Sequence, residues 1–263
     1  MAQEAAKRGV DRIVVAGGDG TTSEIASGLL ELKSSAERPR LGLLPLGSGW
    51  DLARSLGLPR TLDAALAVIS RGHARQIDAG RVELQDGFGE DRSSYFVNEV
   101  SAGLSGVTVE RVGSSAKRIG PRLGFVVGAV GAILSHRPFS ARVEIDGDRV
   151  HEGPISMVVA ANGKFFGAGM KVAPNAEVDS ARIEVVLVRG LSVPRLLANL
   201  PSFYLGRHGD HPGVSFHSAK TLEVIPVLGS SPVDVDGELL GFLPMRAEVM
   251  PGALEIFVPE PVG

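Results

Sequence analysis

A short apolar run that leads into a glycine loop constrains the fold of this 263-residue chain most strongly. Ile13–Ala16 has the composition of a strand buried on both faces, and the loop Gly17–Thr21 follows it directly. A helix is expected from about Thr22, because apolar residues then recur on one face, at Ile25, Leu29 and Leu32. Strand and loop return at Leu41–Leu46 and Gly47–Gly49. The repeat predicts an open, mostly parallel α/β sheet in residues 1–79.

After residue 79 the sequence changes to short strands separated by turn residues. The predicted strands are Arg81–Leu84, Tyr95–Val100, Arg142–Ile145, Ile155–Ala160, Ile183–Val188, Leu222–Val227 and Ala247–Val258. Asp146–Asp148 has the composition of a hairpin turn, and helices are expected near Pro121–Leu134 and Pro194–Leu205. So many short strands predict a β-sandwich domain over residues 80–263, whose last strand could pack back on the first domain.

The composition excludes several kinds of site. The chain has no cysteine, which rules out disulfides, thiolate metal ligands and a cysteine nucleophile. Its formal net charge of −3 gives no global basic field, so no nucleic-acid partner is expected. The longest apolar run, residues 123–134, is too short to span a bilayer, and residues 1–8 lack the pattern of a secretory signal. The sequence therefore suits a cytoplasmic protein.

The glycine loop has a composition suited to phosphate. Glycines let several backbone N–H groups converge on one point, and the helix that follows adds the positive end of its dipole. Asp19 cannot bind phosphate itself, because two anions repel each other; its natural role is to hold Mg²⁺ beside the phosphates. Read from the residues alone, a plain strand-to-helix turn explains the same glycines equally well.

The second loop leaves its strand in the same sense, so both loops are expected at the carboxyl edge of the sheet. Ser48 can donate its hydroxyl to a phosphate. Asp51 lies at the start of a short helix, where capping of that helix is the simpler explanation. A further helix, capped by Thr61, is expected to bury one apolar face.

Ordered motifs over residues 11 to 258 resemble the diacylglycerol kinase catalytic domain of bacterial lipid kinases. That family includes sphingosine and ceramide kinases and is more distantly similar to NAD kinases and phosphofructokinases. The motifs are Gly17–Thr21 with Glu24, Pro45–Arg54, Ile77–Gly80, Phe96–Gly103, Ala161–Gly163, Phe166–Met170, Ala173–Ala176 and Val235–Glu238. The resemblance implies an α/β domain like those of NAD kinase and phosphofructokinase, followed by a β-sandwich.

The resemblance also implies an activity: an ATP-dependent, Mg²⁺-requiring kinase that phosphorylates a lipid hydroxyl of the diacylglycerol class at the membrane surface. It places the general base at Glu238, with Asp236 as an orienting partner or alternative base. A hairpin turn is the competing interpretation of this segment read alone. The implied metal ligands are Asp19 and Asp179. The implied nucleotide-binding residues are Gly17, Gly18, Asp19, Gly20, Thr21, Thr22, Ser23 and Ser48.

Several positions depart from the family pattern. Trp50 stands where the family usually has Asn, so a bulky indole is expected to replace a polar contact near the phosphates. Ser180 replaces a carboxylate next to Asp179, in a segment tied to a secondary magnesium site, and Ala168 replaces a glycine. Family members usually carry a further strand and helix before the segment equivalent to Ala2–Arg8, so we expect an upstream segment. The departures at Trp50, at Ser180 and at the start of the chain keep open an inactive lipid- or nucleotide-binding relative. An NAD kinase is a further alternative, because it shares a glycine-Asp-glycine loop and Asn98–Glu99 resembles its nucleoside contact.

Two further segments have competing interpretations. His208 and His211 are three residues apart in a loop, which favours locally bonded side chains over a metal site. Residues 123–134 are most simply a core helix, and a lipid-facing helix at the inner membrane face is the alternative. The alternative depends on basic residues that flank the apolar run, at Arg111, Lys117, Arg118, Arg122 and Arg137. The sequence does not indicate an oligomeric state.

Overall fold

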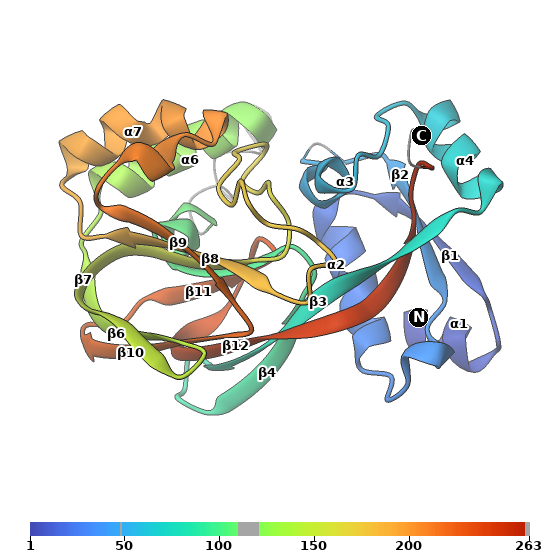
Figure 1. Ribbon diagram of the computed structural model, residues 1–263, viewed down its shortest axis with the longest axis horizontal. Helices are drawn as coiled ribbons and strands as arrows, with labels where there is room; N and C mark the ends of the chain where they lie inside the picture. The colour runs from blue at the N-terminus through green and yellow to red at the C-terminus, as the bar shows by residue number, and fades with distance from the viewer. Residues whose placement is uncertain (48, 110–120, 261–263) are drawn as a thin grey trace.

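The computed structural model describes residues 1–47, 49–109 and 121–260 (Figure 1). Ser48 and three of the basic residues named above, Arg111, Lys117 and Arg118, lie outside the described residues, as does the side chain of Arg122. The described chain forms a smaller α/β part and a larger, mainly antiparallel β part, which lie side by side in Figure 1.

The first part of the chain forms the predicted parallel sheet. β1 (Arg12–Gly17) pairs in parallel along its whole length with β2 (Arg40–Pro45). The helices of this part are α1 (Ala2–Lys7), α2 (Asp19–Leu30), α3 (Asp51–Ser55) and α4 (Leu62–Arg71), with a 3-10 turn at Ser35–Glu37. Buried side chains of β1, β2 and these helices pack into one apolar cluster.

Two helix starts differ from the prediction. α2 begins at Asp19 rather than near Thr22, because Asp19 and Gly20 already belong to its first turn. Thr61 occupies the N-cap position of α4 with extended backbone (φ −93°, ψ 143°), but its side chain makes no capping hydrogen bond. The predicted Thr61 cap is therefore wrong, although the helix begins where the sequence places it.

The rest of the chain is mainly antiparallel. Its strands are β3 (Ala74–Gln85), β4 (Asp91–Phe96), β5 (Glu99–Gly103), β6 (Phe139–Ile145), β7 (Asp148–Ala161), β8 (Ile183–Arg189), β9 (Val214–Ala219), β10 (Thr221–Leu228), β11 (Pro232–Val235) and β12 (Glu238–Phe257). Its helical segments are residues 104–109, α6 (Pro121–Leu134), α7 (Val193–Leu205) and a 3-10 turn at His208–Asp210. The hairpin predicted at Asp146–Asp148 is confirmed, with φ 51° at Asp146 and 89° at Gly147.

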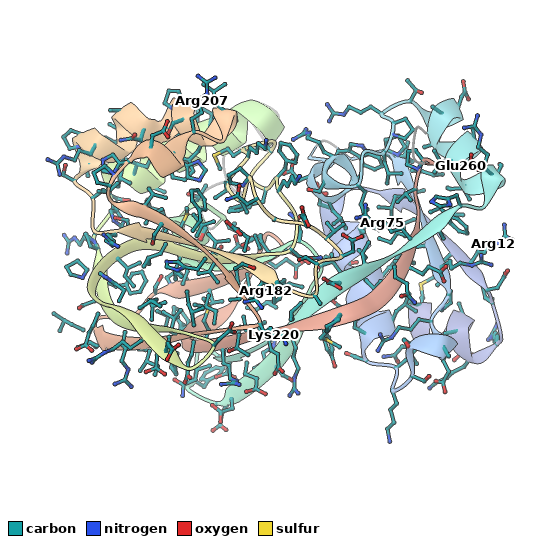
Figure 2. All side chains as sticks on the ribbon, viewed as in Figure 1. Arg12, Arg75, Arg182, Arg207, Lys220 and Glu260 are labelled. Carbon is teal, nitrogen blue, oxygen red and sulfur yellow. The ribbon has the colours of Figure 1, made fainter. Side chains whose placement is uncertain are left out.

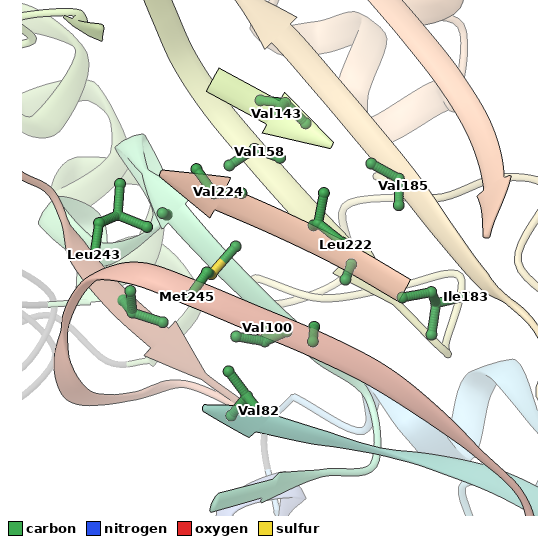
Figure 3. Packing of buried hydrophobic residues seen from close by; sticks show 14 of the residues in the cluster. Val82, Val100, Val143, Val158, Ile183, Val185, Leu222, Val224, Leu243 and Met245 are labelled. Atoms are coloured by element: carbon green, nitrogen blue, oxygen red, sulfur yellow. The ribbon is translucent and has the colours of Figure 1, made fainter. Parts of the chain in front are cut away.

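Six of these strands close on themselves. β12 pairs with β10, β10 with β6, β6 with β7, β7 with β5, β5 with β11, and β11 returns to β12. Alternate side chains of these strands point inward and form one core, part of which Figure 3 shows around Val100, Val158 and Val224. Because the side-chain period of a strand is two residues, the neighbours of these core residues face outward.

The outward face of β7 and β8 is covered by α6 and α7, which lie together over it (Figure 1). Met157 of β7 and Val188 of β8 pack there with Ile133 of α6 and Leu196 of α7. This third layer matters for the site described below, since the cavity lies between the helices and this face of the sheet.

Two long strands connect the halves of the molecule. β12 has 20 residues and ends beside β2, where Ile256 lies opposite Leu41 in parallel. β3 pairs with β12 along both halves, as Figure 1 shows. The domain boundary expected near residue 79 falls inside β3 and stays a prediction.

Candidate active site

The two glycine loops predicted at one edge of the sheet lie against each other. A Cβ added to Gly47 would lie 2.2 Å from the Cα of Gly18, so the two backbones leave no room for a side chain between them. At Gly20 the opposite holds, because a Cβ there would meet no atom within 4 Å. The loops therefore combine a tight backbone crossing with open space beside the first turn of α2.

Gly47→Ala is expected to lower the free energy of unfolding by about 1–3 kcal/mol, because the added methyl group must push two backbones apart. Gly20→Ala is the matched control. It should raise stability by about 0.5–1 kcal/mol, because alanine is the better helix former and has free space. Urea unfolding of both variants measures the difference, and equal midpoints for the two variants would show that the loops do not need this contact.

Asp19 binds the start of a different helix. Its Oδ1 accepts hydrogen bonds from the backbone N–H groups of Asp51, at 2.9 Å, and of Leu52, at 3.3 Å. It therefore caps α3 from the first turn of α2. The capping role considered for Asp51 is wrong, because Asp51 is the first residue of α3 and Trp50 occupies the N-cap position.

The sequence suggested that the Trp50 indole lies near the phosphate site, but Trp50 does not line the cavity described below. Its side chain is 3% exposed and packs in the apolar cluster of the first part of the molecule. Its backbone has φ 63°, the left-handed conformation that Asn and Gly adopt most easily. Ala168, which replaces a usual glycine, likewise has a positive φ, of 60°.

Asp51 is a buried carboxylate beside Asp19. It is 4% exposed and accepts a hydrogen bond from Arg54 Nη1 at 2.9 Å. Burial, and next the nearby charge of Asp19, raise the pKa of Asp51 to about 7, against the opposing effects of Arg54 and of backbone N–H groups from the loop Phe166–Met170. Two neighbouring carboxylates such as Asp19 and Asp51 are a natural place for a divalent cation.

The free energy of unfolding of the protein without ligands is expected to fall as the pH rises from about 4 to 7. The fall is up to roughly 1.4 kcal/mol per pH unit for each buried carboxyl group whose pKa is raised, as that of Asp51 is. The folded-state pKa of Asp51 is raised, so its protonated form contributes stability below the unfolded pKa, and this is lost as pH rises through about 7. Asp51→Asn should reduce the slope of unfolding free energy against pH by the contribution of one titrating proton. Urea unfolding at a series of pH values tests this, with Asp63→Asn on α4 as the control, and an unchanged slope in Asp51→Asn would contradict it.

Asp236 joins three elements through its carboxylate. Its Oδ2 accepts from Ser23 Oγ of α2 and from the N–H of Val97, each at 2.8 Å. Its Oδ1 accepts from the N–H groups of Asn98 and Glu99, each at 2.9 Å. Both oxygens are thus occupied, and burial still raises the pKa of Asp236.

This contact explains why the strand predicted over Tyr95–Val100 is wrong. β4 ends at Phe96 and β5 begins at Glu99, because the intervening backbone N–H groups turn toward Asp236 instead of a neighbouring strand. Glu238, the predicted base, is exposed at the start of β12, directly after Gly237, which lines the cavity.

The other predicted residues have defined places. Thr22 donates its hydroxyl to the carbonyl of Gly18 at 3.0 Å within α2, and the side chain of Thr21 fills the space that a Cβ on Gly17 would need. Asp179 forms an ion pair with Arg75, labelled in Figure 2, through Nε at 2.6 Å and Nη2. It does not line the cavity.

No group of three or more His, Asp or Glu side chains in the described part of the chain is arranged to hold a metal ion by itself. His208 instead packs as a core residue, with its ring stacked on Phe203 at 4.2 Å and Nε2 beside the carbonyl of Val172 at 2.9 Å. Asp78, within one of the resembling motifs, accepts from the N–H groups of Ala181 and Gly252 and so fixes the loop before β8 and the irregular segment of β12.

A cavity of about 500 Å³ runs from these loops to the helices of the outer layer. One end is acidic, and its side chains include Asp19, Asp51, Asn98 and Asp236. The other end is apolar, with side chains that include Leu104, Ile133, Met157, Phe166, Leu196 and Phe203. Glu99 and Asp234 also line it. Glu99 was considered from the sequence only as part of a nucleoside contact of the NAD kinase alternative, and no prediction included Asp234.

Comparisons with known proteins agree with this geometry. Residues 1–82 match the model of the diacylglycerol kinase catalytic domain, and residues 98–258 match that of the YegS C-terminal NAD kinase beta sandwich-like domain. A Chromohalobacter salexigens protein named "probable lipid kinase YegS-like" is 33% identical over 99% of this chain and 80% of its own length. The chain belongs to the diacylglycerol kinase family. It is therefore a lipid kinase, a phosphotransferase with an alcohol acceptor.

Further relatives support the same family and fold. A diacylglycerol kinase of Staphylococcus carnosus is 27% identical over 96% of this chain and 78% of its own length. The crystal structure of a Bacillus anthracis diacylglycerol kinase has a TM-score of 0.73 at 20% identity, covering 100% of this chain and 82% of that one. Yeast NADH kinase shares the fold alone, with a TM-score of 0.56 at 14% identity, covering 99% of this chain and 64% of that chain. The predicted order of an α/β part and a sandwich-like part agrees with these matches.

The residues present fit a nucleotide and Mg²⁺. The open space at Gly20, beside the N–H groups of the first turn of α2, suits a phosphate group. Asp19 and Asp51 lie together at the same end of the cavity. Mg²⁺ commonly takes one or two protein carboxylates and completes its shell with water and phosphate oxygens, so a third protein ligand is not required.

Proposed function

We propose that this lipid kinase transfers the γ-phosphoryl group of ATP to the hydroxyl of a diacylglycerol-like lipid. The cavity is the observation that carries the proposal, since it joins an acidic end beside the glycine loops to an apolar end. The large side chains of the apolar end include Leu104, Ile133, Met157, Phe166, Leu196 and Phe203. An acyl chain fits the apolar end, and the hydroxyl then lies at the acidic end.

Each part of the site has a task in this proposal. The first turn of α2 and the loops around Gly18 and Gly47 would bind the phosphates, and Asp19 and Asp51 would hold the metal. Bound Mg²⁺ neutralises phosphate charge, which is the main requirement of phosphoryl transfer. Glu238 would accept the proton of the lipid hydroxyl. Asp236 fixes the corner between β4 and β5 and so positions the wall of the cavity.

Transfer from labelled ATP to a lipid extract tests the proposal. Label is expected in a diacylglycerol spot, and its absence from every lipid would overturn the proposal. NAD in a parallel reaction tests the competing NAD kinase activity, which predicts label on the dinucleotide. An inactive relative would label neither acceptor.

We also propose that α6 and α7 bind the membrane surface peripherally. No helix in the described part of the chain is long and apolar enough to cross a bilayer. Among the described side chains of these helices, Val127 at 51%, Leu134 at 62% and Leu205 at 65% are nevertheless largely exposed. They lie on the two helices that cover the apolar end of the cavity, where a lipid has to enter.

Leu134→Asp with Leu205→Asp is expected to reduce recovery on lipid vesicles about tenfold, because two charges then face the acyl region. Vesicle flotation measures the recovery. Leu62→Asp on α4 is the control, since Leu62 is 45% exposed but lies in the other half of the molecule. Equal recovery of both variants would contradict membrane binding through α6 and α7.

A further inference from the structure

The helical segment of residues 104–109 places a buried hydroxyl group in the wall of the cavity. The segment follows β5 directly, and Leu104, Ser105, Thr108 and Val109 of this segment line the cavity. Ser105 is 9% exposed, and its Oγ is buried without a hydrogen-bond partner within the described residues. Buried polar atoms normally have partners. Since Ser105 lines the cavity, a molecule bound there can supply the missing one.

Packing against β11 holds this segment in place. A Cβ added to Gly106 would lie 2.7 Å from the carbonyl oxygen of Pro232, so the two backbones are in direct contact. Within the segment, Thr108 donates its hydroxyl to the carbonyl of Leu104 at 2.7 Å. The position of Ser105 in the wall is therefore fixed by its neighbours and not by a bond of its own hydroxyl.

The neutral side chains of the described lining offer few hydrogen-bond donors. Those with a donor are Asn98, Ser105 and Thr108. Asn98 donates Nδ2 to the carbonyl of Phe165 at 2.9 Å, and Thr108 donates to Leu104. Ser105 alone among these three has no acceptor in the part of the chain that the structure describes. Its hydroxyl proton needs an acceptor, which a ligand group that only donates cannot provide.

Ser105 lies where the apolar end of the cavity meets the strand that carries Asp234. Its neighbour Leu104 packs in the apolar cluster that α6 and α7 form with β7 and β8. Its other neighbour, Gly106, contacts Pro232, which is two residues before Asp234 on β11. When a lipid hydroxyl lies at the acidic end and an acyl chain at the apolar end, the linkage of that chain to the glycerol lies between them. In a diacylglycerol the linkage is an ester, whose carbonyl oxygen is a hydrogen-bond acceptor.

We propose that Ser105 binds the carbonyl oxygen of this linkage, so that the protein selects ester-linked over ether-linked lipid alcohols. The inference rests on the proposed phosphorylation of a diacylglycerol-like lipid and narrows its substrate class. In an ether-linked lipid a methylene group replaces the carbonyl group, which leaves the Ser105 proton without an acceptor in the complex. A site built to hydrogen-bond a substrate group discriminates strongly against analogues that lack it.

Two lipids of matched chain length test the inference: a diacylglycerol and the dialkylglycerol in which a methylene group replaces each ester carbonyl. In the wild-type protein, kcat/KM is expected to be about fivefold higher or more for the ester, the effect of one buried donor left unpaired. In Ser105→Ala the ratio should fall to about one, because neither lipid then meets a hydroxyl group. The fall should come from a lower kcat/KM for the ester.

Two further variants serve as references. Thr108→Val is the matched control, since Thr108 lines the same wall but already donates its hydroxyl to Leu104, and it should retain the ester preference. Ser105→Cys, whose thiol is a weak donor, should lie between wild type and Ser105→Ala. A wild-type ratio near or below one, or an unchanged ratio in Ser105→Ala, would overturn the inference. So would an equal loss of the preference in Thr108→Val.

Urea unfolding shows whether the hydroxyl is free in the protein without lipid. Because Oγ of Ser105 has no partner among the described residues, Ser105→Ala should unfold at the same urea concentration as wild type or at a higher one. A clearly lower midpoint would mean that the protein itself already satisfies this hydroxyl, and the inference would then be wrong.

Lipid binding without nucleotide separates the inference from the proposed transfer. The diacylglycerol is expected to raise the Tm of the wild-type protein more than the dialkylglycerol does, and Ser105→Ala should respond equally to both. Equal shifts in the wild-type protein would overturn the selectivity even if diacylglycerol is phosphorylated. Unequal shifts without transfer to any lipid would instead remove the proposed transfer and leave the selectivity standing.

Discussion

Glu238→Gln is expected to lower kcat for phosphoryl transfer by about 10²–10⁴-fold, the usual contribution of a general base. The Glu238 carboxylate is exposed at the start of β12 and makes no hydrogen bond or ion pair within the described residues, so it is free to accept a proton. Glutamine has nearly the same shape but cannot act as the base. The free energy of unfolding should change by less than about 0.5 kcal/mol, as for other exposed positions.

Steady-state transfer assays and urea unfolding measure both parts of this result. Glu248→Gln is the matched control, because Glu248 is an exposed glutamate on the same strand. It should retain wild-type kcat. Transfer by Glu238→Gln at the wild-type rate would remove the base assignment and would favour Asp236 as the proton acceptor.

Asp236→Ala is expected to lower the free energy of unfolding by about 3 kcal/mol or more and to reduce transfer together with stability. The substitution leaves the Ser23 hydroxyl and three backbone N–H groups without their acceptor. Each buried donor left unpartnered is destabilising by about 1–3 kcal/mol. Asp236→Asn should lie between wild type and Asp236→Ala, because an amide oxygen accepts some of these bonds and Asn tolerates the φ of 50° found here.

Urea unfolding and the transfer assay check this ordering. Asp91→Ala, at an exposed position of β4, is the control and should retain wild-type stability. An Asp236→Ala variant with wild-type stability and little activity would contradict the structural role and indicate direct participation in the reaction. The contrast with Glu238→Gln separates the two carboxylates, since only one of them is expected to affect folding.

Local sequence patterns predicted the strand and loop order around Gly17–Thr21, the Asp146–Asp148 turn and most strands of the second half, because each depends on periodicity or on turn residues. They could not predict that Asp19 caps α3, since the partner N–H groups lie on another loop. The break between β4 and β5 was missed for the same reason, because a residue 138 positions away in sequence, Asp236, produces it.

Glu99 and Asp234 show a different limit. A charged residue between two valines, as at Asp234, normally indicates a solvent-exposed strand face. Here that face lines the cavity, and the segment of residues 104–109 packs against Pro232 of β11, which the sequence of β11 does not indicate. β9 and β11 themselves were missed, because short strands with Ser, His, Pro or Asp lack a strong apolar alternation.

The ribbon of β3 and β12 affects how the molecule can move. The two halves are not joined by a flexible linker, because paired backbones run from one into the other. Relative motion of the halves must therefore bend or twist this ribbon. Its pairing is irregular between Phe242 and Met245 and again between Met250 and Leu254, where Gly252 has φ 58° and donates its N–H to Asp78. The bending stiffness of the β3–β12 ribbon would therefore govern how far the nucleotide and lipid ends of the molecule can separate.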